Sequence, residues 1–213
     1  MNNQRIFCAL FFILLSFPVI QANTDKFYGL KEKLSNSHVN YIYQDKKGFI
    51  WICTDNGLNV FDGTEFKTYY HVQNDTTSLE NNSVLSILDD SRGHLWVGTT
   101  GGLQLLDRET DRFSTIHFSY PYITDFSYIS CIIEDSQGNI WLSTSRSGAI
   151  CLKADTYRPI YYLQTNSNIC SDKINTIFED RFGNIWIGSQ DQGVFCFSPQ
   201  GTIIHHYEYN DKS

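Results

Sequence analysis

The side chains that could take part in chemistry fall into three small groups, and the first is a set of acidic pairs. They recur as Asp89–Asp90, Glu134–Asp135 and Glu179–Asp180. Paired carboxylates can act as a general acid and base, or bind calcium. Each pair, however, opens a turn that contains glycine, where Asp commonly accepts hydrogen bonds from the turn's own amides. We therefore interpret the pairs as turn residues.

The second group is His205–His206, and the third is the turn from Ser145 to Gly148. Neighbouring residues of a strand point to opposite faces, so the two histidines would chelate a metal poorly and are interpreted as solvated residues of an edge strand. The serine turn lacks the glycine spacing of a nucleophile elbow, and no phosphate-binding glycine motif occurs. The sequence thus predicts no catalytic residue, no metal and no cofactor.

The four tryptophans are more informative because they are spaced 45 residues apart, and each lies in a ten-residue phrase that starts with Asp and has Gly at its fourth position. The tryptophans are Trp51, Trp96, Trp141 and Trp186; the other members are Asp45, Asp90, Asp135, Asp180, Gly48, Gly93, Gly138 and Gly183. Exposed indoles could stack on sugars or bases. A residue that recurs at one internal position is better explained by packing between repeats, so we assign this set a structural role.

A repeat of this length, built from short β-branched apolar runs, is typical of β-propeller blades. The sequence therefore predicts an all-β fold with four four-stranded antiparallel blades, at about 34–71, 79–118, 124–163 and 169–207, within one repeat region 34–213. Four blades are the lower end of the usual range, and no blade draws strands from both ends of the chain. We expect an incomplete arc of a larger propeller.

The N-terminus resembles a secretory signal peptide over residues 1–22, followed by a lead segment, 23–33. Arg5 supplies the positive charge, Ile6–Phe17 the apolar stretch and Ala22 a cleavage point. Such a stretch is short for a membrane span, so export with cleavage is expected, and an uncleaved anchor is the alternative. Cys8 lies inside the apolar stretch, which argues against a lipoprotein.

Charge and cysteine content narrow the class of protein further. The formal charge of −7, without a basic run, disfavours nucleic-acid and anionic-membrane binding. The five cysteines beyond the signal show no CxxC spacing. Cys151 and Cys196, each ten residues after a tryptophan, are expected to be small buried apolar residues. Cys151 and Cys196 could form a disulfide only if their Cα atoms came within about 7 Å.

The loops leave one candidate ligand site. In a propeller, the connections between blades share a rim with the second turn of each blade, and variable loops on a repeated scaffold commonly bind ligands. Aromatic rings beside polar side chains suit a sugar, and the alternative is an ordinary wet rim with half-buried tyrosines. The predicted rim residues are Asp55, Asn56, Tyr120, Tyr122, Asp125, Arg146, Gln190, Asp191 and Gln192.

The repeated phrase resembles the two-component regulator propeller repeat. Residues 34–69 carry the resemblance well, the second copy matches equally closely, and the later copies drift at Ser143, Ala149 and Ser198. The resemblance implies the N-terminal, periplasmic sensor part of a hybrid two-component histidine kinase, of a kind that detects oligosaccharides and can contact a second copy through its propeller. No His is followed by Glu as in a kinase phosphoacceptor box, so no catalysis is expected in this chain.

The resemblance also sets the expected surroundings and the alternatives. Membrane contact would come only through downstream segments or through an uncleaved signal. The alternatives are a free-standing exported interaction module, a truncated product without function and, less favoured because acid–base residues are missing, a propeller hydrolase or lyase.

Overall fold

The computed structural model describes residues 33–119, 127–165, 169 and 171–208. The predicted signal peptide (1–22), nearly all of the lead segment and three predicted rim residues, Tyr120, Tyr122 and Asp125, lie outside the described residues.

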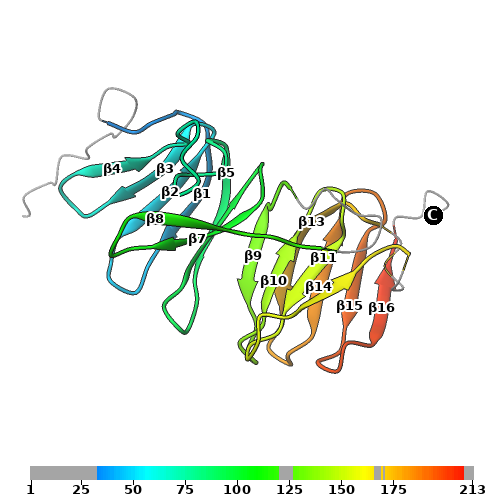
Figure 1. The fold of residues 1–213 in the computed structure, drawn as a ribbon. Helices are drawn as coiled ribbons and strands as arrows, with labels where there is room; N and C mark the ends of the chain where they lie inside the picture. The colour runs from blue at the N-terminus through cyan, green and yellow to red at the C-terminus, as the bar shows by residue number, and fades with distance from the viewer. Residues whose placement is uncertain (1–32, 120–126, 166–168, 170, 209–213) are drawn as a thin grey trace, which may run out of the picture.

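The described chain forms sixteen strands in four antiparallel sheets of four (Figure 1), which confirms the predicted all-β blades. The first sheet holds β1 (Val39–Gln44), β2 (Ile50–Thr54), β3 (Gly57–Phe61) and β4 (Phe66–Tyr69); the second holds β5 (Val84–Asp89), β6 (Leu95–Thr99), β7 (Leu103–Asp107) and β8 (Arg112–Ile116). The third holds β9 (Cys131–Glu134), β10 (Ile140–Ser143), β11 (Ala149–Leu152) and β12 (Pro159–Tyr162); the fourth holds β13 (Ile174–Glu179), β14 (Ile185–Ser189), β15 (Val194–Phe197) and β16 (Ile203–Tyr207).

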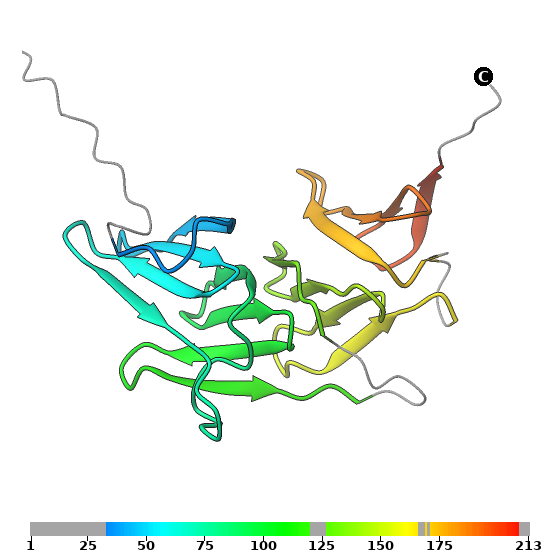
Figure 2. The ribbon, with the colours of Figure 1, turned by 90° about the horizontal axis from the view of Figure 1, so that it is seen from above.

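The sheets are the blades of a propeller-like arc. In each blade the strands, called A to D here, pair in chain order, and the A strands of successive blades contact one another. Figure 2 shows blades 1 and 4 at the two ends of an open arc. We call the side with the turns at 55–56, 100–101, 145–147 and 190–192 the B–C rim, and the side with the turns beginning at Asp45, Asp90, Asp135 and Asp180 the A–B rim.

The repeated Asp and Trp belong to one local device in every blade. In blade 1, Oδ1 of Asp45 accepts hydrogen bonds of 2.9 Å from the amides of Lys47 and Phe49, while Oδ2 accepts one of 2.9 Å from Nε1 of Trp51. The corresponding Asp–indole distances in blades 2, 3 and 4 are 2.9, 2.8 and 3.0 Å. Gly48 has φ of +90°, which favours glycine at this point of the turn. One carboxylate therefore shapes the hairpin and fixes the indole.

The apolar core lies between the blades. Blades 1, 2 and 3 each turn a face that bears the Trp, together with strand-D aromatic or aliphatic residues, toward the next blade; we call it the Trp face. The next blade receives it with an aliphatic face, which in blade 2 consists of Leu79, Val84, Ile87, Leu95, Val97, Leu106 and Phe113. Trp51 packs in this first cluster, and the second and third interfaces repeat the arrangement. Burial of these side chains is the main force holding adjacent blades together.

The first member of each acidic pair has a different role from the one predicted. Glu134, at the end of β9, accepts a hydrogen bond of 2.7 Å from the amide of Ser91 in the preceding blade. Glu179 does the same for Ser136, at 2.7 Å from the amide and 2.6 Å from the hydroxyl. Only the second member of each pair organises its own turn. The first is an interblade latch, because the end of strand A lies beside the preceding A–B turn.

Candidate functional site

The B–C rim carries a polar cluster where blade 1 meets blade 2. Asp55 accepts hydrogen bonds from Nδ2 of Asn40 at 2.9 Å and from the Ser83 hydroxyl at 3.4 Å, and its other oxygen pairs with the ring of His38. These contacts, that from Asn40 first, lower the pKa of Asp55. Asp55 is therefore an exposed, ionised acceptor whose orientation is fixed by two blades.

A second polar cluster lies on the same rim in blade 4. Asp191 accepts a hydrogen bond of 2.6 Å from the buried Ser171 hydroxyl and pairs with Nζ of Lys173 at 3.4 Å. The hydrogen bond from Ser171, followed by that from Lys173, lowers the pKa of Asp191. Like Asp55, Asp191 is an exposed carboxylate whose orientation is fixed by neighbouring side chains.

The remaining described rim residues lie on blades 1, 3 and 4. Asn56 and Arg146 are exposed, on blades 1 and 3, and Gln190 is exposed next to Asp191. Gln192 is half-buried, and its carbonyl lies 2.8 Å from Nε2 of His206. The predicted set is therefore distributed over three blades of one rim. The structure brings Gln190, Asp191 and Gln192 together in one turn, and it places Asp55 and Asn56 in another.

The histidines differ from the prediction of two solvated rings. His205 is exposed, but the half-buried ring of His206 is stacked on Phe195 with centroids 4.2 Å apart. The pairing of Phe195 with His206 across β15 and β16 accounts for this, because cross-strand neighbours share a face of the sheet. His206 therefore supports the Gln192 turn of the B–C rim.

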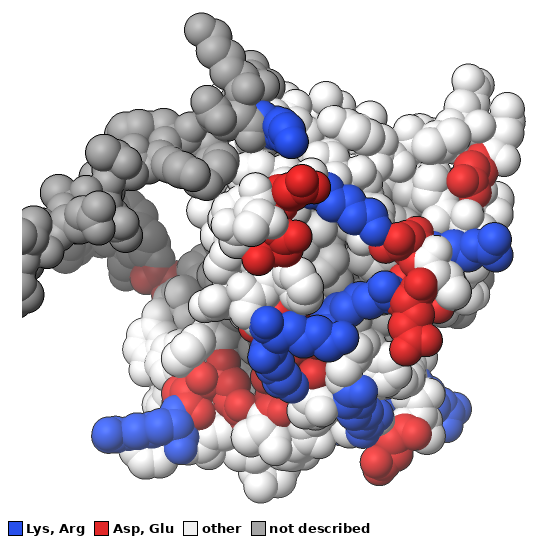
Figure 3. Space-filling view, turned by 90° about the vertical axis from the view of Figure 1, so that its left-hand side faces the viewer, with Lys and Arg blue, Asp and Glu red and all other residues white. Residues whose placement is uncertain are grey.

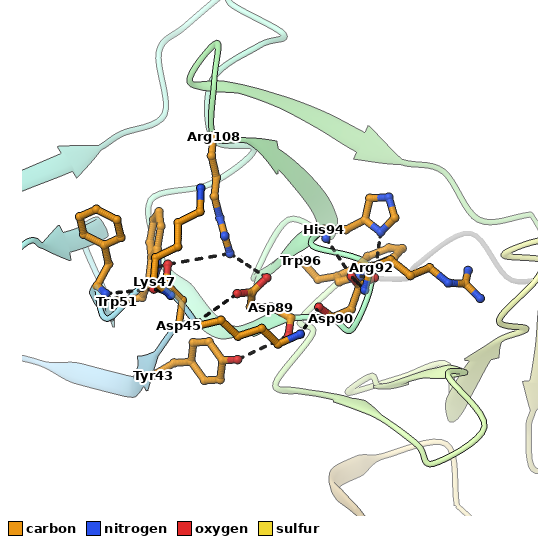
Figure 4. A network of polar contacts seen from close by, with 12 residues as sticks. Tyr43, Asp45, Lys47, Trp51, Asp89, Asp90, Arg92, His94, Trp96 and Arg108 are labelled. Carbon is orange, nitrogen blue, oxygen red and sulfur yellow. Dashed lines mark hydrogen bonds and ion pairs between the residues drawn. The ribbon is translucent and has the colours of Figure 1, made fainter.

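The A–B rim carries a charged network that the sequence did not predict. Arg108 follows β7 and extends between blades 1 and 2, where its Nη2 lies 2.9 Å from Oδ1 of Asp89 and 3.9 Å from Oδ2 of Asp45 (Figure 4). Both carboxylates are buried. The 2.9 Å contact lacks hydrogen-bond geometry and leaves the buried Nε and Nη2 of Arg108 without acceptors. We interpret Arg108 as the counter-charge that makes burial of two carboxylates tolerable.

His94 extends this network toward blade 3. Its Nδ1 lies 3.0 Å from Oδ2 of Asp90 and 3.0 Å from the hydroxyl of Tyr157, which belongs to the next blade (Figure 4 shows His94 above Asp90). Burial alone would raise the pKa of Asp90, but hydrogen bonds from Trp96 and His94 outweigh it, so the pKa is lowered. His94 thus connects the turn of blade 2 to blade 3.

An open groove of about 560 Å³ runs along blade 2 at this rim, with Lys47, His94, Arg108 and Glu109 among its lining residues. The groove offers both signs of charge, and Asp107 in its wall already accepts bonds from its own turn, including 2.7 Å from the Thr110 hydroxyl. Among the described residues that line the groove, no nucleophile is paired with a base. What it provides is a surface of charged and aliphatic side chains.

A signal for Arg108 and His94 exists in the repeat itself. Both are departures at fixed positions: the site of His94 is Asn139 and Asn184 in blades 3 and 4, and strand register aligns Arg108 with Pro199. Like Asn139 and Asn184, His94 contacts Oδ2 of the Asp that opens its turn. It differs from them in its added contact to Tyr157 of blade 3.

Other site types find no support in the part of the chain that the structure describes. It contains no group of three His, Cys, Asp or Glu side chains placed to hold a metal, and no helix able to cross a membrane. Cys53, Cys131, Cys151 and Cys196 are free thiols there. Figure 3, seen from the side of blade 1, shows basic and acidic side chains interspersed rather than gathered into one basic patch.

Comparison with known proteins agrees with this architecture. Four segments, 33–56, 78–101, 125–146 and 168–191, match the family described as two component regulator propeller. An 82-residue segment is 37% identical to a histidine kinase of Formosa agariphila and covers 37% of this chain but 6% of that protein.

Solved structures of extracellular domains also resemble this chain. The extracellular domain of the hybrid two component system BT3049 from B. thetaiotaomicron is 27% identical with a TM-score of 0.76; the match covers 86% of this chain and 26% of that one. The extracellular domain of BT4673 from the same organism is 24% identical with a TM-score of 0.67, covers 76% of this chain and 24% of that one, and shows the shared fold. The chain thus spans about a quarter of these domains.

Proposed function

Because the chain carries four two component regulator propeller repeats, we propose that it is the ligand-sensing propeller of an exported, periplasmic sensor in a hybrid two-component system. The observation that carries this proposal is the match over 86% of the chain to an extracellular domain of such a system. The chain's part is recognition, and catalysis belongs to a kinase region elsewhere in a full-length sensor.

We further propose that the ligand is an oligosaccharide bound on the B–C rim. Asp55 and Asp191 support this, because each is an exposed carboxylate whose direction is fixed by neighbouring side chains. Sugar hydroxyls are good donors to such preoriented acceptors. Asn56, Arg146 and Gln190 add exposed polar side chains on the same rim, and Tyr120, Tyr122 and Asp125 belong to the proposed site by their place in the chain.

Isothermal titration of the full chain with fractionated neutral and acidic oligosaccharides tests this proposal. We expect one pool to bind, and Asp55→Ala or Asp191→Ala to weaken that binding at least tenfold. Asp62→Ala is the matched control, since Asp62 is an exposed turn carboxylate of blade 1 that bonds only within its own C–D turn on the opposite rim. Absence of binding to every pool, or equal losses in all three variants, would argue against a sugar site on the B–C rim.

A further inference from the structure

Tyr128 occupies a repeat position on the B–C rim, but its backbone differs from that of its counterparts. His38, Ser83, Tyr128 and Lys173 are spaced 45 residues apart, each shortly before strand A of its blade. Of these four, Tyr128 alone has a positive φ, +62°. The left-handed region is sterically costly for a bulky L-residue. The strain therefore lies at the junction of blades 2 and 3, inside the arc.

The altered backbone removes a hydrogen bond that recurs in the other blades. The amides of Asp55, Thr100 and Gln190 each donate to the carbonyl of the residue at this position in the same blade, at 3.3, 3.0 and 2.9 Å. Blade 3 has no such bond between Ser145 and Tyr128, both of which the structure describes. The amide of the half-buried Ser145 is therefore available to another acceptor on the B–C rim.

Blade 2 holds the strained residue in place through the residue that follows it. The buried Ile129 donates its amide to the carbonyl of Thr99 at 3.1 Å, and its own carbonyl accepts a hydrogen bond of 2.8 Å from the Ser86 hydroxyl. Because both polar groups of Ile129 are bound to blade 2, relaxing the backbone of Tyr128 would disturb these contacts. Strain that is fixed in this way is typical of ligand-binding positions.

Tyr157 shows how the same strain is offset elsewhere in the chain. Its φ is +52°, its ring packs against His94 and Trp96 with centroids 5.7 and 5.3 Å away, and its hydroxyl lies 3.0 Å from Nδ1 of His94. Among the described residues Tyr128 has no such compensation: it belongs to no apolar cluster, its hydroxyl has no hydrogen-bond partner, and it is 46% exposed. The fold thus holds at the rim an aromatic ring that its own packing does not use.

We propose that Tyr128 is the stacking platform for one pyranose ring of an oligosaccharide on the B–C rim, with the amide of Ser145 donating to a hydroxyl of that sugar. This subsite presupposes the proposed oligosaccharide sensing and adds the chemistry of one contact. The C–H face of a pyranose is apolar and suits the face of an aromatic ring, while its hydroxyls accept hydrogen bonds. Tyr128 lies between Asp55 of blade 1 and Asp191 of blade 4 along the rim, and it supplies the apolar contact that these carboxylates lack.

Isothermal titration with a pool of short neutral gluco- and galacto-oligosaccharides tests the subsite. The wild-type chain should bind this pool, and Tyr128→Gly should weaken binding at least tenfold. Tyr128→Phe should bind within about twofold of the wild-type chain, because stacking needs the ring and not the hydroxyl. Tyr157→Gly is the matched control: it removes a tyrosine of the same backbone conformation from the A–B rim, and it should bind normally.

Urea unfolding of the same variants distinguishes a ligand-binding ring from a structural one. Gly adopts the left-handed region without strain, so Tyr128→Gly should keep or raise the urea midpoint, whereas Tyr157→Gly should lower it through lost packing. If the wild-type chain binds no oligosaccharide pool, neutral or acidic, both the sugar site and this subsite are wrong. Binding that Asp55→Ala weakens and Tyr128→Gly does not, or an equal fall of the two midpoints, would overturn the subsite alone.

Discussion

Blades 2 and 4 share a sequence pattern, yet they differ in how much of it is buried. In blade 2 the indole of Trp96 is 1% exposed between strands of two blades, while Trp186 of blade 4 is only half-buried. The hydrogen bond from the indole to its Asp is the same, 2.9 Å in blade 2 and 3.0 Å in blade 4. The local device is therefore set by each blade's own sequence, and burial is set by its neighbours.

This difference separates two contributions to stability that usually occur together. The Asp–Trp hairpin is present in both blades, so differences between them report the interblade packing. In a repeat array, stability is approximately a sum of terms within repeats and terms between neighbours. The following predictions test that separation, beginning with the largest effect.

Truncating the two tryptophans should give unequal losses. Trp96→Ala removes a fully buried indole and should lower the free energy of unfolding by about 3–5 kcal/mol. Trp186→Ala removes a partly exposed indole with the same hydrogen bond and should cost roughly 1–2 kcal/mol. Urea unfolding followed by circular dichroism measures both. Equal losses would mean that the hairpin, rather than the neighbouring blade, determines the contribution of the indole.

The second-largest loss of stability is expected from the charged network around Arg108. Arg108→Ala leaves Asp45 and Asp89 buried without their counter-charge and should cost about 2–3 kcal/mol, less than for a fully buried pair because the Arg108 side chain is partly exposed. Adding Asp89→Asn should recover part of that loss, since one uncompensated charge disappears. Pro199→Ala, at the matching place in blade 4, is the control and should change stability little. Additive losses from Arg108→Ala and Asp89→Asn would contradict the assigned pairing.

Acid should weaken the hairpins through their carboxylates, which is the smallest effect. The hydrogen bond from Trp186 is the largest of the contacts that lower the pKa of Asp180, from 3.8 to about 2. A lowered folded-state pKa means that the stabilising contribution is complete above about pH 4 and is lost as the pH falls toward 2. Urea midpoints measured across this range should fall for the wild-type chain and fall less for Asp180→Asn. An unchanged slope in that variant would contradict the role of Asp180.

The sequence predicted the structural features that depend on one blade alone. Residue types and a 45-residue period were sufficient for the strand order, the turns and the position of every tryptophan, because these depend on neighbours along the chain. The latch role of Glu134 was missed, since its partner Ser91 lies 43 residues away and the pair looks like an ordinary turn start. Arg108 was missed for a related reason: its two carboxylates come from different blades.

The proposed binding rim was predictable only as a list of exposed residues. Asn40 reaches Asp55 from the neighbouring strand of the same blade, and Ser83 reaches it through the approach of blade 2 to blade 1, which no local pattern encodes. Similarly, the stacking of His206 on Phe195 depends on the register of β15 and β16. Contacts between strands and between blades therefore limit what sequence alone can say about the site.

The buried thiols have a consequence for the reactivity of the folded chain. Burial raises the pKa of Cys53 and Cys151 to about 12, so almost no thiolate exists in the folded state to attack a disulfide. Reaction with an oxidant or an alkylating reagent then requires a blade to open. The rate at which each cysteine is labelled therefore reports the rate at which its own blade opens. Labelling can thus measure the local stability of the arc one sheet at a time.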